Sequence, residues 1–249
     1  MAIQFLRRLT GTIRTDKADE HLGFAMAFVA GAANAGGFLA VKQYTSHMTG
    51  ILSSMADDAV MGELGLVTAG LGALISFGAG AACSAILINW ARRKQLHSVY
   101  ALSLMLEAFL LLCFGLAGAN LSQHMGLHVS LTVMLLCFIM GLQNAIITKI
   151  SNARIRTTHV TGMVTDLGIE LGKLVYWNSE KEYLPENRVL GDRSKLRLLG
   201  SLLIMFFIGG LVGAFGFSHL GFISTIPLAF ILLLLSIVPV LDDIIFHFK

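Results

Sequence analysis

The chain has 249 residues, of which 55% are hydrophobic and 13% are charged. Soluble globular proteins carry about 25% charged residues, so the composition excludes an ordinary soluble domain and indicates a membrane protein. The net charge of +3 does not by itself indicate a nucleic-acid partner, and we expect none.

Six apolar stretches follow one another along the chain, and each is long enough to cross a bilayer as a helix, which takes about 20 residues. They cover residues 22–41, 64–91, 98–119, 127–148, 196–218 and 221–241. We therefore predict an all-α, polytopic membrane protein with six transmembrane helices, forming one membrane domain over residues 1–249.

The basic residues gather on one side of this predicted topology. If the N-terminus is cytoplasmic, the inside segments hold all but one of the 18 Lys and Arg residues, and the exception is Lys42. Cytoplasmic loops of membrane proteins carry such an excess of positive charge. We therefore expect both termini to be cytoplasmic, together with a polar loop at residues 178–194.

A polar signature occurs twice. The sequence T-S-H-M-T-G at residues 45–50 returns as T-T-H-V-T-G at 157–162, and G-x-x-N-A precedes each copy, at 31–35 and 141–145. Each signature follows the first of three spans, so the chain divides into a repeat over 22–119 and a repeat over 127–241. Because three is odd, the second repeat enters the membrane from the opposite side, which predicts inverted repeats with a site where they meet.

The segments after the signatures are too short and too polar for ordinary spans. Residues 51–62 and 163–177 read as short amphipathic helices, which could lie flat at the interface or enter the membrane as re-entrant half-helices. Irregular backbone at membrane depth is tolerated only inside protein or beside water. We favour the re-entrant interpretation because the same polar sequence occurs twice.

The signatures are candidate solute sites. Thr and Ser before a helix are good N-caps, so a capped turn is the simplest interpretation. A helix N-terminus inside the membrane would also offer free N–H groups and a positive dipole end. Two such ends approaching from opposite faces would form a pocket for an anion or a polar neutral solute. The predicted lining residues are Thr45, Ser46, Thr49, Thr157, Thr158 and Thr161.

Two histidines and three amides extend this candidate site. His47 and His159 occupy equivalent places, and because Thr-x-His is not a metal-ligand spacing, we expect proton coupling rather than a metal, and no cofactor. Asn34 and Asn144 could form hydrogen bonds between helices or line the same pocket, together with Gln143.

Three acidic residues could bind protons or ions. Glu107 lies near the centre of the third span, where burying a charged carboxylate costs at least about 2.5–3.5 kcal/mol. It is either a protonated structural residue or a group that titrates or faces solute. Asp58 and Glu170 each follow their signature glycine by eight residues. They could be solvated helix faces, or could pair with the histidines or a cation.

The paired signatures G-x-x-N-A with T-S-H-M-T-G, and G-L-Q-N-A with T-x-V-T-G, resemble those of the YoaK-like family of uncharacterised bacterial multispanning membrane proteins. The resemblance covers residues 20–245. It departs at Ile51, where that family usually has Asn, and at Asn34, where many relatives have Asp. It implies the multispanning architecture and a bacterial cytoplasmic (inner) membrane, and leaves the substrate open.

We predict a membrane transporter or channel for a small polar or anionic solute, coupled to protons if the histidines or Glu107 titrate, and not an enzyme. Its partners would be the lipid bilayer and the solute or ion, with a second copy of the chain as a further candidate. Two other classes stay open. One is an intramembrane enzyme or metal-binding protein that uses the His and acidic residues, and the other is a structural membrane protein without a solute path.

Overall fold

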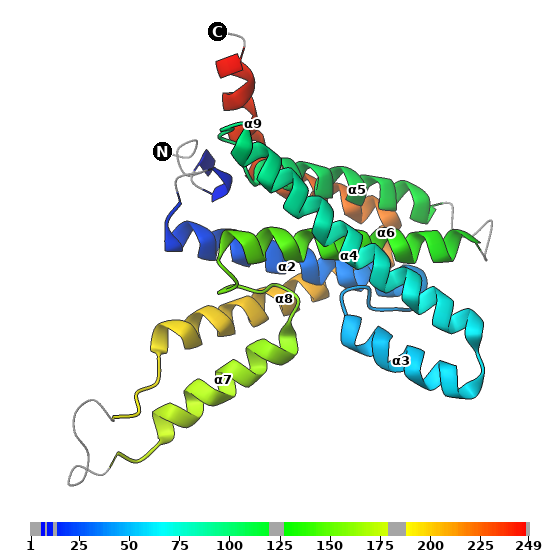
Figure 1. Cartoon of the computed structure of the whole chain (residues 1–249), viewed down its shortest axis with the longest axis horizontal. Helices are drawn as coiled ribbons and strands as arrows, with labels where there is room; N and C mark the ends of the chain where they lie inside the picture. The colour runs from blue at the N-terminus through cyan, green and yellow to red at the C-terminus, as the bar shows by residue number, and fades with distance from the viewer. Residues whose placement is uncertain (1–5, 8, 12–13, 120–126, 179–187, 248–249) are drawn as a thin grey trace.

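The computed structural model describes residues 6–7, 9–11, 14–119, 127–178 and 188–247, and these residues form an all-α protein (Figure 1). The α-helices are α2 (Asp16–Val41), α3 (Met48–Met61), α4 (Leu64–Arg93), α5 (Ala101–Ala119), α6 (Leu127–Ile150), α7 (Val160–Val175), α8 (Arg193–His219) and α9 (Thr225–His247). A 3₁₀ turn, η3 (Gly221–Ser224), joins α8 to α9.

Among the described residues, six helices are long and apolar enough to span a membrane: α2, α4, α5, α6, α8 and the η3–α9 segment. They coincide with the six predicted stretches, so the all-α, multispanning prediction is confirmed. Most of the predicted polar loop, residues 179–187, lies outside the described residues. The flanks of this loop are joined by the carboxamide of Asn178, which donates to the carbonyl of Val189 and accepts from its N–H, both at 3.0 Å.

Two of the long helices begin at side-chain caps. The hydroxyl of Thr15 accepts a hydrogen bond from the N–H of Ala18 at the start of α2, and the carboxylate of Asp192 accepts from Ser194 and Lys195 at the start of α8. Such caps satisfy N–H groups that have no partner within the helix.

α2 packs closely against α8. At Gly31, a built Cβ atom would overlap the carbonyl oxygen of Phe206, and at Gly209 a Cβ would overlap the carbonyl oxygen of Phe28. Each helix therefore presents a glycine to the backbone of the other. Small residues permit this close approach. Membrane helices depend on such van der Waals packing, because the hydrophobic effect does not drive helices together in lipid.

α6 packs against α4 in the same way. A Cβ at Gly141 would overlap the carbonyl oxygen of Phe77, and a Cβ at Gly80 would overlap that of Phe138. The first helix of each predicted repeat thus packs on the second long helix of the other repeat. Figure 1 shows α2 and α6 side by side and antiparallel, with α4 and α8 crossing them.

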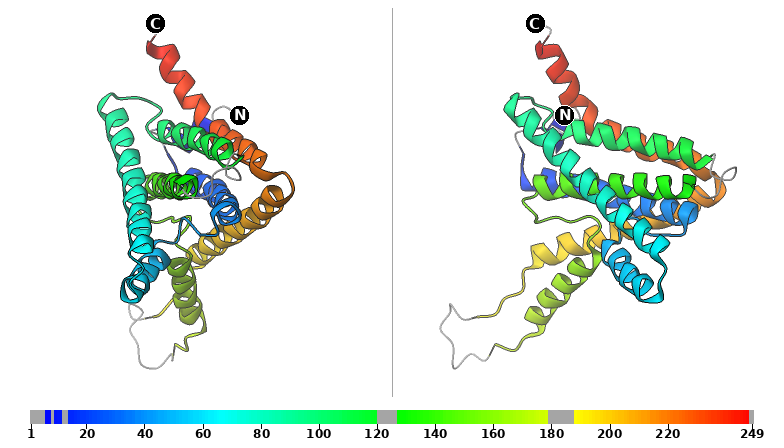
Figure 2. Two further views of the ribbon diagram at one scale, coloured as in Figure 1. Left: turned by 90° about the vertical axis from the view of Figure 1, so that its right-hand side faces the viewer. Right: turned by 45° about the vertical axis from the view of Figure 1, so that its right-hand side comes forward.

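α5 and α9 pack against each other and complete the bundle. α9 bends along its length (Figure 2). Pro239 lies inside this helix and cannot donate the backbone hydrogen bond of its turn, which is a common cause of a kink. Beyond Pro239, Asp242 accepts hydrogen bonds from the Arg7 guanidinium at 2.5 and 2.6 Å, and Asp243 accepts from the backbone N–H groups of His97 and Ser98. Both ends of the described chain and the α4–α5 turn are joined there.

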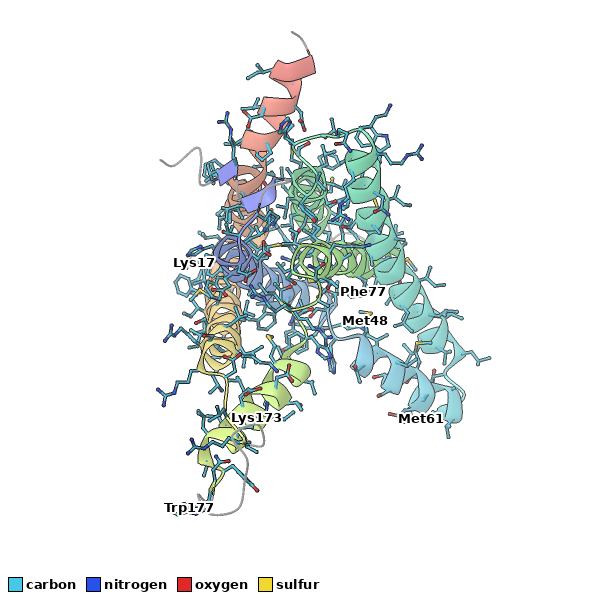
Figure 3. The ribbon with its side chains drawn as sticks, turned by 60° about the vertical axis from the view of Figure 1, so that its left-hand side comes forward. Lys17, Met48, Met61, Phe77, Lys173 and Trp177 are labelled. Carbon is cyan, nitrogen blue, oxygen red and sulfur yellow. The ribbon has the colours of Figure 1, made fainter. Side chains whose placement is uncertain are left out.

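The two short helices diverge from the bundle. In Figure 1 the chain turns back after α2 and after α6, so that α3 and α7 begin beside the C-terminal halves of these helices and run outward, α3 to the lower right and α7 to the lower left. Figure 3 shows Met48 at the inner end of α3 and Met61 at its outer end, with Trp177 far out beyond α7. The positive dipole ends of α3 and α7 are therefore the ends nearer to each other.

Candidate functional site

The first signature is held against its own preceding helix. Lys42 ends α2 in the left-handed conformation, with φ 56° and ψ 24°, and reverses the chain. The hydroxyl of Ser46 then donates to the carboxamide oxygen of Asn34 at 3.0 Å. Asn34 therefore fixes the signature loop to α2.

The second signature repeats this contact. The hydroxyl of Thr158 donates to the carboxamide oxygen of Asn144 at 2.7 Å, and the amide of Asn144 donates to the carbonyl of Met140 at 2.8 Å. Positive φ values at Asn152 and Ala153 mark the corresponding chain reversal. Both asparagines thus bond to the signature of their own repeat, a role that differs from the interhelical bonds considered from the sequence.

The first threonine of each signature is fully buried. Thr45 and Thr157 have no exposed surface, and neither side-chain oxygen has a hydrogen-bond partner in the described part of the chain. Buried polar groups are nearly always hydrogen-bonded, and an exception calls for an explanation such as an unseen water or ion. These matched hydroxyls are available to a bound polar group.

The signature histidines are exposed and occupy the N-cap positions of α3 and α7, where neither makes a side-chain cap hydrogen bond. The ring of His47 covers Gly50 and the ring of His159 covers Gly162, because a Cβ atom at either glycine would overlap the ring. The glycine of each motif, which has no side chain, therefore leaves room for the imidazole ring. The guanidinium of Arg156 also lies 3.2 Å from Nδ1 of His159.

Thr49 and Thr161 are exposed at the second position of α3 and α7. Since His47 and His159 do not cap these helices, the N–H groups of the first turns are left without a side-chain acceptor. Free N–H groups at a helix N-terminus attract anions and polar acceptors, and the two threonine hydroxyls extend the same surface.

The two signatures lie at different levels of the bundle. Gly37 lies against Leu136, and because α2 and α6 are antiparallel, Asn34 is level with about residue 139 of α6. Asn144 is five residues further along, which is about 7.5 Å at 1.5 Å per residue. No hydrogen bond between described residues joins one signature to the other. The structure therefore shows two matched polar positions, and a single pocket shared by both stays a prediction.

Gln143 is fully buried, and its amide donates to the carbonyl of Met26 at 3.1 Å, which ties α6 to α2. Its carboxamide oxygen has no partner among the described residues. The same position in the first repeat is Ala33, so this amide has no counterpart there. Gln143 is therefore a polar contact between the repeats with one acceptor still free.

Glu170 is buried and makes hydrogen bonds and ion pairs with neighbouring residues. Only 3% of the residue is exposed. The backbone N–H of Asp192 donates to it at 2.9 Å and the ammonium of Lys173 at 3.0 Å, while Lys195 lies at 3.6 Å. These two hydrogen bonds, the backbone one first, lower the pKa of Glu170 below its ordinary value. The ionised carboxylate of Glu170 therefore links α7 to the start of α8.

Asp58, at the matching position of α3, is half-buried. Its carboxylate makes no hydrogen bond or ion pair with any described residue. The interactions predicted between these acids and the motif histidines are absent from the hydrogen bonds and ion pairs of the described residues.

Glu107 is fully buried in α5, and neither carboxylate oxygen has a partner among the described residues. Ser103, one helical turn earlier and therefore on the same face, is also buried with a free hydroxyl. In the described part of the chain, no group of three or more His, Cys, Asp and Glu residues could hold a metal ion.

The model of one protein family matches residues 22–238, nearly the whole chain, and the family is described as DUF1275, proteins of unknown function. The chain belongs to the DUF1275 family. No curated protein and no solved structure matches it. Membership in DUF1275 is consistent with the YoaK-like resemblance, and it names no activity and no substrate.

Several residues that shape the site in this DUF1275 chain were not found from the sequence. Arg156 contacts the second signature histidine, and Lys195 and Asp192 reach Glu170 from the start of α8. Residues 62–66, before the second span, have an acidic residue, Glu63, at the position of Asp192, but they have no lysine at the position of Lys195. A comparison of the two segments would have shown that the lysine is present in the second repeat alone. The free hydroxyls of Thr45 and Thr157 were included in the predicted site, although their burial could not be read from the sequence.

Proposed function

We propose that this DUF1275 protein is a transporter or channel for a small polar or anionic solute in the bacterial cytoplasmic membrane, with both termini inside. It would be built from two inverted repeats, with α3 and α7 as re-entrant half-helices. The observation that carries the proposal is the matched pair of buried, unpartnered hydroxyls of Thr45 and Thr157, each beside an uncapped helix N-terminus.

The inverted repeat is supported by corresponding contacts. A shift of 110 residues along the chain relates Phe28 to Phe138 and Gly31 to Gly141. A shift of 129 residues relates the residues of α4 and α8 that these four residues contact. The four glycine–carbonyl contacts of the α2/α8 and α4/α6 crossings exchange with one another under these shifts. The antiparallel course of α2 and α6 agrees with a twofold axis in the membrane plane.

The re-entrant interpretation is supported by the course of the chain. α3 and α7 have 14 and 16 residues, too few to cross a bilayer. They begin beside the C-terminal halves of α2 and α6, where the signatures bond to Asn34 and Asn144, and run toward opposite ends of the bundle (Figure 1). In a membrane this course would bring both N-termini toward the midplane, where free N–H groups suit an anion or a polar acceptor.

Proton coupling is a further part of the proposal. His47 and His159 are exposed at the same two helix starts, and the proposal assigns proton exchange to their imidazoles. Glu107 is a buried carboxyl with no partner among the described residues, which suits a group that carries a proton in the membrane interior. Uptake that depends on pH would connect these residues to transport.

The test is solute entry into proteoliposomes, followed by light scattering with chloride, formate, phosphate, glycerol and urea as probes. Thr45→Val and Thr157→Val keep the side-chain shape and remove hydroxyls that no described residue uses. They should therefore leave thermal stability unchanged while reducing entry of the permeant probe. Losing one hydrogen bond to the solute would cost about 0.5–1.5 kcal/mol.

Ser84→Ala is the matched control, because Ser84 is also a buried hydroxyl without a described partner and belongs to α4 rather than to a signature. It should keep wild-type entry. Wild-type entry in both threonine variants, or entry no faster than in empty liposomes for every probe, would reject the proposed site.

A further inference from the structure

A pocket of about 230 Å³ lies between α3, α4 and α6. Asp58 is its only charged lining residue, and Gln43, Ser54 and Ser130 supply neutral polar groups. Apolar side chains, including Met55 and Met134, form the rest of the wall. A half-buried carboxylate among apolar groups, with no described partner, favours a cation that brings its own charge into the pocket.

The second repeat shows what such a carboxylate binds. Glu170, eight residues after its signature glycine as Asp58 is after the first, has the Lys173 ammonium at 3.0 Å and the Lys195 ammonium at 3.6 Å. The shift that relates the two signatures places Met61 at the position of Lys173. The first repeat therefore lacks this ammonium.

The second ammonium is missing as well. α4 begins at Leu64 and α8 at Arg193, and these starts are related by the shift of 129 residues that also relates the glycine contacts of α4 and α8. Under this alignment Lys195 corresponds to Leu66, which lines the pocket. Both internal cations of the second repeat are thus replaced by neutral side chains around Asp58.

We infer that this pocket binds a small primary alkylammonium ion, with Asp58 as its counter-ion. The chemistry is that of the Lys–Glu170 contact, with the ammonium supplied by a separate molecule. The neutral polar groups can accept its remaining N–H bonds, and the apolar wall suits its alkyl chain. A bare metal ion fits less well, because hard cations take six or more oxygen ligands.

The pocket has room for such a molecule. Its volume of about 230 Å³ is several times the roughly 30 Å³ that a water molecule occupies in the liquid, and it is below the 300–1,000 Å³ typical of drug-sized ligands. This inference does not rest on transport, because a bound alkylammonium could be a substrate, a co-transported ion or a regulator.

The probe is n-butylammonium, which reproduces the lysine side chain from Cβ to Nζ, titrated by calorimetry into the purified full-length protein in detergent at constant chloride. We expect saturable binding, weakened about tenfold to hundredfold by Asp58→Asn, the range for a charge-assisted hydrogen bond. Asp57→Asn is the matched control, since Asp57 is exposed and does not line the pocket. n-Butanol, the neutral analogue, should not compete.

A second variant tests the comparison between the repeats. Leu66→Lys restores the ammonium of the second repeat on an exposed position, so it should fold and should block n-butylammonium by occupying Asp58. No saturable binding to the wild type, equal binding by Asp58→Asn, competition by n-butanol, or unimpaired binding by Leu66→Lys would each overturn the inference.

Discussion

The close helix crossings allow one prediction to be worked through in detail. Gly80→Ala places a methyl group against the carbonyl oxygen of Phe138 in α6. A backbone carbonyl cannot rotate away as a side chain can, so α4 and α6 must separate. Overpacking of this kind typically costs about 1–3 kcal/mol, which is about 2–12 °C in melting temperature for a chain of this size.

The control lies two residues away. Gly78 is exposed on the same helix, and a Cβ there meets nothing within 4 Å. Gly78→Ala should therefore leave the melting temperature unchanged or raise it, because alanine is favoured over glycine in a helix by up to about 1 kcal/mol. The measurement is thermal unfolding in detergent, followed by tryptophan fluorescence and by size-exclusion chromatography of the soluble fraction.

The second repeat supplies an independent pair. Gly209→Ala meets the carbonyl of Phe28 as Gly80→Ala meets that of Phe138, whereas a Cβ at Gly200 meets nothing within 4 Å. The two variants that meet a backbone carbonyl should lose similar stability, and the two variants at open positions should lose none. Equal melting temperatures for Gly80→Ala and Gly78→Ala would refute the argument from backbone contact.

Three further outcomes are expected. Thr158→Val, which removes the hydrogen bond to Asn144, should lower stability by about 1 kcal/mol in the same thermal assay, whereas Thr165→Val on the exposed face of α7 should not. Glu170→Gln should destabilise the protein at neutral pH. Because the folded-state pKa of Glu170 is lowered from 4.5, the contribution of this residue is complete above that value and is lost as pH falls through the lowered pKa, so the variant and wild type should converge in acid. If the difference in stability between Glu170→Gln and the wild type persisted in acid, the ion pair of Glu170 would be contradicted. In a variant without Cys83, Cys113 and Cys137, Gln95→Cys should react with an impermeant maleimide only from the cytoplasmic side, and labelling from outside would overturn the topology.

The membrane architecture was predictable because it depends on composition and length. Six apolar stretches predict six spans wherever each is long enough and lightly charged. The bounds agree with the helices to within a few residues, apart from α2, which begins earlier, at Asp16, and α9, which ends later, at His247. The repeat of Gly31 and Asn34 as Gly141 and Asn144 also identified positions that the structure uses twice.

The partners of the site residues were not predictable. Asn34 and Asn144 were expected to bond between helices or face a solute, but which acceptor or donor an amide meets depends on how the loop folds back. The unequal surroundings of Asp58 and Glu170 depend on residues 66 and 195, which lie in the first turns of α4 and α8 and belong to no motif. Spacing along the chain does not reveal contacts made across the bundle.

The exchange of partners between the repeats has a consequence for biogenesis. Since α2 buries its glycine face on α8 and α4 buries its own on α6, a nascent chain that has inserted only its first half holds the faces of α2 and α4 open to lipid. The interlocked core can form only after α8 leaves the translocon. The same interlocking suggests an ancestor in which two identical three-span chains exchanged helices as a dimer before their genes fused.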